Sequence, residues 1–172
     1  MVKLFGVFFL IFGAVGFSAC LCREVKSRLI FLKEMKNMFL LIQSQIQYGG
    51  IPINRILQEM TGKMQAPLCE VLQKISERLF AEDGEEFASV WNEEMEAVFI
   101  SYALTKEQKA LLLRFPEVLG AFNREGQAQS LYRYIDELDK WIEQGEKEEK
   151  DRNKIIMSLG TAAGILLSIL LL

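Results

Sequence analysis

A long, predominantly apolar run lies near each end of the chain, residues 4–22 and 155–172, and neither run contains a charged side chain. A helix rises about 1.5 Å per residue, so a run of this length reaches roughly 27 Å, close to the thickness of bilayer hydrocarbon. We therefore predict a transmembrane helix over residues 1–22, a domain over residues 23–154 and a second transmembrane helix over residues 155–172.

Basic side chains gather on the inner flank of each apolar run. Only Lys3 precedes the first run, and no charge follows the second. The inner flanks carry Arg23, Lys26, Arg28, Lys33, Lys36, Lys147, Lys150, Arg152 and Lys154. Basic residues favour the cytoplasmic side of a membrane, so this distribution predicts a cytoplasmic central domain.

One alternative interpretation of the N-terminus remains open. The residues Phe17-Ser18-Ala19-Cys20 resemble a lipoprotein cleavage site, with small residues before a cysteine that can be lipidated. Cleavage there would place the domain outside the cell. The basic cluster that directly follows, and the second apolar run with its own basic flank, favour retention and a cytoplasmic domain.

Between the runs, apolar residues recur in steps of three and four, which is the period of an amphipathic helix. The first such stripe contains Val25, Leu29, Leu32, Met35, Phe39, Ile42 and Ile46. It predicts that the first membrane helix continues into the domain and stops at Gly49-Gly50. Pro52 and Pro67 each suit the first turn of a further helix, and Gly62 ends the first of these.

Polar residues mark the remaining helix boundaries. Two capping boxes are predicted, Asp83 with Glu86 and Thr105 with Gln108, and Pro116 is expected to kink or end the segment after the second. Asn123 is a plausible N-cap for a long final helix that continues into the second apolar run. No segment has a period of two. The predicted fold is an all-α cytoplasmic bundle of about six helices flanked by N- and C-terminal transmembrane helices.

Composition excludes several classes of chemistry. The chain has no histidine, so serine–histidine and cysteine–histidine nucleophiles and the commonest metal ligand are missing. Its three cysteines have no metal-site or disulfide-framework spacing. The net charge of −3 provides no basic field for nucleic acid. We predict no catalytic residue, no cofactor, no metal and no nucleic-acid partner.

Three patterns are candidate contact surfaces. Gly160 and Gly164 have the four-residue spacing that lets membrane helices pack closely. Glu85, Glu86, Glu93 and Glu94 belong to an acidic stretch that is either a solvated face or a surface for a basic partner. The aromatic residues Trp91, Tyr132, Tyr134 and Trp141 are expected in the core, with an exposed docking surface as the alternative.

The order of several short motifs resembles the stage III sporulation protein AB family of endospore-forming bacteria over nearly the whole chain. The residues that carry the resemblance are Tyr48, Gly49, Pro52, Trp91, Leu119, Gly120, Asn123, Arg124 and Gln127, together with Gly160 and Gly164 in the second run. The chain departs from the family pattern at three positions. Gln45 replaces the usual acidic residue, Asn123 stands where Asp is common, and Pro116 stands where Gly is usual. The loss of charge at Gln45 weakens any ionic contact expected there.

The resemblance implies a helical domain similar to those of type II secretion and type IV pilus platform proteins. It also implies a non-enzymatic component of the mother-cell complex that joins a forespore channel across the two membranes around the developing spore. The protein would lie in the mother-cell membrane, which becomes the outer forespore membrane. The expected partners are the secretion-type ATPase stage III sporulation protein AA and other membrane proteins of the same operon. The alternatives are a membrane-anchored regulator that binds a protein outside any secretion machine, and an enzyme at the membrane face.

Overall fold

The computed structural model describes the backbone of residues 2–49, 51–81, 85–119 and 124–171. The side chains of residues 2–22, 48, 49, 124, 125, 157, 161 and 163–171 lie outside the description. Every regular element among the described residues is a helix, and they contain no strand. The helices are α1 Val2–Gly49, α2 Ile53–Thr61, α3 Leu68–Phe80, α4 Phe87–Phe99, α5 Lys106–Leu113, α6 Phe115–Leu119 and α7 Arg124–Leu171.

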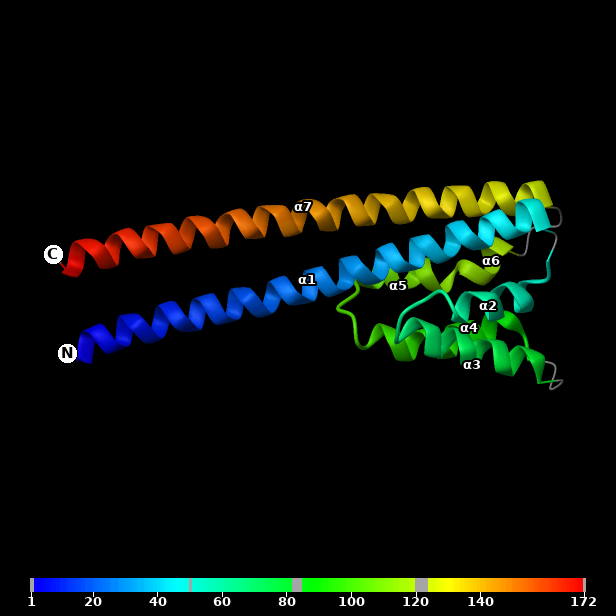
Figure 1. The fold of residues 1–172 in the computed structure, drawn as a ribbon, viewed down its shortest axis with the longest axis horizontal. Helices are drawn as coiled ribbons and strands as arrows, with labels where there is room; N and C mark the ends of the chain where they lie inside the picture. The colour runs from blue at the N-terminus through cyan, green and yellow to red at the C-terminus, as the bar shows by residue number, and fades with distance from the viewer. Residues whose placement is uncertain (1, 50, 82–84, 120–123, 172) are drawn as a thin grey trace.

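The longest helices, α1 and α7, lie side by side and antiparallel, so both chain ends lie at the same end of the molecule (Figure 1). The five shorter helices pack against the opposite half of this pair (Figure 1). Each long helix therefore passes without interruption from the bundle toward one of the two apolar runs. The prediction that the first and last helices continue through both regions is confirmed.

Ion pairs join α1 to α7 along their length. The ammonium of Lys36 lies 2.5 Å from a carboxylate oxygen of Asp139, and that of Lys33 lies 2.7 Å from Glu146. The hydrogen bond from Lys33 lowers the pKa of Glu146. Solvent screens exposed pairs of this kind, so each contributes little to stability.

The core brings four helices together around Phe39 of α1, which is fully buried. Its ring centroid lies 4.6 Å from that of Phe115 on α6, 5.0 Å from Tyr134 on α7 and 6.5 Å from Trp91 on α4. Aromatic rings of this size dominate the apolar area that a small domain can bury. The same core includes residues of α2 and α3, such as Leu57 and Leu72. The all-α bundle predicted from the sequence is confirmed.

Local signals placed most helix ends correctly. Thr105 accepts a hydrogen bond from the backbone N–H of Gln108, and the Gln108 side chain accepts one from the N–H of Thr105, so the predicted capping box is present. Pro52 and Pro67 precede α2 and α3, and Gly62 follows α2. Helix α5 ends at Leu113, with Arg114 at its C-cap, and a separate short helix begins at Phe115. Pro116 therefore lies in the first turn of α6.

The other predicted capping box is wrong. Helix α4 begins at Phe87, with Glu86 itself at the N-cap position and no side-chain hydrogen bond there. Glutamate is a poor N-cap residue because its longer side chain does not match the geometry that Asp and Ser reach. Asp83 and the predicted N-cap Asn123 lie outside the described residues.

The predicted membrane spans fall largely outside the described side chains. Where side chains are described, no helix has a stretch that is both long and apolar enough to cross a bilayer. Residues 4–22 and most of residues 155–172 are not in that part of the structure. The two spans stay a prediction from the sequence.

Candidate functional site: an acidic cluster around Arg78

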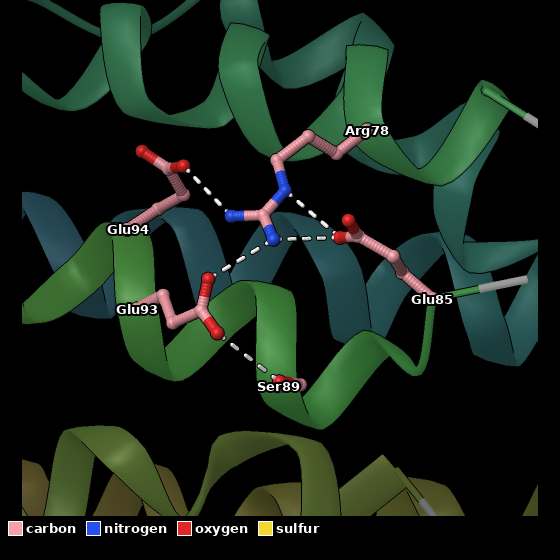
Figure 2. A network of polar contacts seen from close by, with 5 residues as sticks. All are labelled: Arg78, Glu85, Ser89, Glu93 and Glu94. Atoms are coloured by element: carbon pink, nitrogen blue, oxygen red, sulfur yellow. Dashed lines mark hydrogen bonds and ion pairs between the residues drawn. The ribbon is translucent and has the colours of Figure 1, made fainter. Parts of the chain in front are cut away.

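Arg78, in the last turn of α3, holds three of the four glutamates predicted as a partner surface (Figure 2). Its guanidinium lies 2.6 Å from Glu85, 3.0 Å from Glu93 and 3.0 Å from Glu94. The planar guanidinium offers five N–H donors, so one arginine can bind several carboxylates at once. The hydrogen bonds from Arg78 to Glu93, Glu94 and Glu85 raise the pKa of the arginine.

We call Arg78, Glu85, Glu93 and Glu94 the Arg78 cluster. It joins the last turn of α3 to Glu85, just before α4, and to the middle of α4. Its formal charge is −2, because three carboxylates surround one guanidinium. Glu94 is the most enclosed of the three carboxylates, with 19% of its side chain exposed, and Glu93 the least, with 61%. The cluster is thus an ordered acidic surface as well as a link between two helices.

Glu86, the fourth predicted residue, lies beside the cluster and is exposed. No described side chain forms an ion pair with it. The end of α3 and the start of α4 lie at the end of the bundle opposite the chain termini (Figure 1). A soluble partner would therefore meet this surface at the part of the domain farthest from the apolar runs.

The structure contradicts an exposed docking role for two of the four aromatic residues. Trp91 is fully buried, and its indole N–H donates a 3.0 Å hydrogen bond to the backbone carbonyl of Leu112. Tyr134 is 3% exposed, and burial raises the pKa of its hydroxyl. Both rings pack where α4, α6 and α7 meet α1. Tyr132, on the outer side of α7, is 66% exposed, and Trp141 is partly buried.

Apart from Trp91, which is buried in the middle of α4, the described family-motif residues lie at helix boundaries. Pro52 accepts backbone hydrogen bonds from Arg55 and Ile56, both at 3.1 Å, and so starts α2. The side-chain amide of Gln127 donates a 2.8 Å hydrogen bond to the carbonyl of Leu119, which ties the start of α7 to the end of α6. These contacts fix how α1 leads into α2 and how α6 leads into α7.

Other motif residues are only partly described. Tyr48 and Gly49 end α1 and Arg124 begins α7, but only their backbone is described. Gly120 and Asn123 lie wholly outside the described residues.

The glycine pair proposed for membrane packing is only partly described. A Cβ atom built at Gly160 meets no atom within 4 Å among the residues whose side chains are described. Gly164 lies where side chains are not described. Its packing role stays a prediction.

The close approach at Gly145 was not predicted from the sequence. A Cβ atom at this position would lie 3.2 Å from a methyl group of Leu29, so the absence of a side chain lets α7 pack tightly on α1. The contacts of Arg78 with the acidic stretch were not predicted either. A lone basic residue shortly before the acidic stretch was the available signal, but the contacts of Arg78 depend on how α3 and α4 pack.

Comparison with known proteins agrees with the resemblance seen in the motifs. The sequence profile described as Stage III sporulation protein AB matches residues 3–172. The chain belongs to the stage III sporulation protein AB family. The Stage III sporulation protein AB of Bacillus subtilis (strain 168) is 23% identical over 173 residues and is aligned over the full length of both chains.

A solved structure of a stage III sporulation protein AB has the same fold. It matches with a TM-score of 0.65 at 18% identity and covers 73% of this chain and 98% of its own. At this identity the match supports the helical architecture alone. The family description names a sporulation protein and no enzymatic activity.

Proposed function

We propose that this stage III sporulation AB family member is a non-enzymatic platform in the mother-cell membrane, which becomes the outer forespore membrane. In this proposal the two apolar runs anchor the chain and residues 23–154 stand in the cytoplasm. The domain docks a secretion-type ATPase, stage III sporulation protein AA, and the membrane helices contact other proteins of the same operon.

The observation that supports docking most strongly is the position and order of the Arg78 cluster. It offers an acidic surface at the end of the bundle farthest from the chain termini. Complementary charge accelerates encounter with a partner and fixes its orientation, and this effect weakens as salt is added. The continuous helices α1 and α7 would carry any movement at this surface toward the membrane.

The test measures binding of the purified ATPase to the full-length chain in detergent, at ATPase concentrations up to about 100 μM, where a weak complex with ΔG near −5.5 kcal/mol is part-populated. Glu86→Lys is the informative variant because Glu86 is exposed and makes no described ion pair. Glu143→Lys, on the exposed side of α7, is the matched control for net charge.

We expect Glu86→Lys to slow association several-fold at low salt, with Glu143→Lys close to the unmodified chain. Equal binding by the two variants would exclude the acidic surface as the docking site. If the unmodified chain shows no binding at all at the highest ATPase concentration, the ATPase is not its direct partner.

A further inference from the structure

A polar cavity lies between α1, α5 and α7, in the part of the bundle closest to the apolar runs. Its volume is about 180 Å³, and its walls include Arg28, Gln108, Gln144, Glu148 and Arg152. A single water needs roughly 10–15 Å³ of such volume, so the cavity has room for a phosphate group and its waters. We propose that it binds the phosphate of an anionic phospholipid headgroup, an inference that rests on the membrane anchoring proposed above.

Two donors on the cavity wall are available to a phosphate. No described acidic side chain forms an ion pair with Arg152, so its guanidinium is free to bind an anion. Gln108 is 4% exposed, and its amide oxygen already accepts from the N–H of Thr105. The NH₂ group of Gln108 has no described acceptor and can donate to a phosphate oxygen.

One carboxylate faces the same cavity, but it is already neutralised. Glu148 accepts a 2.9 Å hydrogen bond from Arg28, whose second nitrogen donates to the backbone carbonyl of Ala103 at 3.4 Å. The Arg28 side chain is 17% exposed, which makes this the most enclosed cation of the ion pairs between α1 and α7. The pair leaves Arg152 as the uncompensated charge on the wall.

The surroundings of the cavity are basic although the whole chain is acidic. Residues 23–28 and 147–154 carry seven basic and four acidic side chains, a net charge of +3, whereas the full chain has −3. The bundle is thus polarised, with positive charge next to the apolar runs and the Arg78 cluster at the other end. Anionic lipid surfaces attract basic segments beside membrane helices, and basic pockets there bind lipid headgroups.

The distance along the helices places the Arg152 end of the cavity at headgroup depth, with Arg28 just beyond it. Arg152 lies three residues before the second apolar run and Arg28 six residues after the first, about 5 and 9 Å along their helices. The polar layer of a bilayer is roughly 5–8 Å thick on each side. Arginine side chains reach several ångströms along the helix toward such a layer. A lipid phosphate is favoured over free phosphate because the bilayer concentrates it at this depth.

The experiment uses the full-length chain in detergent micelles doped with phosphatidylglycerol or with phosphatidylcholine, and counts retained lipids by native mass spectrometry. A flotation assay with liposomes comes first and tests the anchoring itself. We expect phosphatidylglycerol to be retained and phosphatidylcholine to be lost. Arg152→Gln should weaken retention about tenfold, because hydrogen bonds to charged groups are among the strongest.

Lys150→Gln is the matched control. It removes one charge two residues away from Arg152, and the Lys150 side chain does not line the cavity. Equal losses in the two variants would mean that the general basic field binds the lipid and that the cavity does not. Equal retention of the two lipids would also overturn the inference. If millimolar inorganic phosphate displaces phosphatidylglycerol, free phosphate is the ligand. Failure to float would overturn the anchoring and the lipid site together.

Discussion

Replacing Phe39 with alanine tests whether α1, α4, α6 and α7 share one core. Phe39 is fully buried, and rings from α4, α6 and α7 lie within 6.5 Å of its own. Core Phe→Ala changes cost about 3–5 kcal/mol, from lost apolar burial and from the cavity left behind. We expect the upper half of that range, because four helices would have to move together to fill the space.

The matched control is Phe80→Ala, the same chemical change at a side chain that is 49% exposed. Full burial of a Phe contributes about 1.5–3 kcal/mol, so the control should lose less than about 1.5 kcal/mol. Urea unfolding of the full chain in a nonionic detergent reads out both variants through fluorescence, since both tryptophans lie in the domain.

With a urea slope of about 2 kcal/mol per molar, Phe39→Ala should lower the midpoint by roughly 2 M. A shift no larger than that of Phe80→Ala would refute the shared core.

Three further predictions concern helix packing, an ion pair between helices and a helix cap. Gly145→Val should destabilise the domain by about 1–3 kcal/mol, because its side chain would meet Leu29 where only 3.2 Å is available, and urea unfolding measures the loss. Lys36→Asp should cost up to about 1 kcal/mol, and adding Asp139→Lys should restore most of it, whereas additive losses in the double variant would exclude the pair. Thr105→Ala should cost about 1 kcal/mol and speed hydrogen exchange at the start of α5, and unchanged exchange there would show that the capping box is not stabilising.

Much of the fold could be predicted because its signals are local. The proline positions before α2 and α3 and the Thr105 box each depend on a few neighbouring residues. The missed start of α4 shows the limit of such signals. Asp83 matches the capping pattern, but the helix starts at Phe87, whose ring packs on Trp91 and Phe115. The contact of Phe87 with Phe115 joins α4 to α6, and no local pattern encodes it.

The candidate site depended on contacts that no local pattern encodes. The acidic stretch was visible in the sequence, but its organisation by Arg78 follows from the packing of α3 on α4. The pairing of Arg28 with Glu148 joins residues 120 positions apart. Surface charges on an amphipathic helix look alike in sequence, so their partners emerge only when α1 and α7 are placed side by side.

Cysteine labelling that shows which side of the membrane the domain occupies tests the proposed function most directly. Lys63, exposed between α2 and α3, becomes cysteine in a variant with serine at Cys20, Cys22 and Cys69. A membrane-impermeant maleimide is then applied to cells that express the chain, before and after the membrane is opened. A cytoplasmic domain predicts labelling only after opening. Labelling in intact cells would place the domain outside and remove the ATPase from its reach.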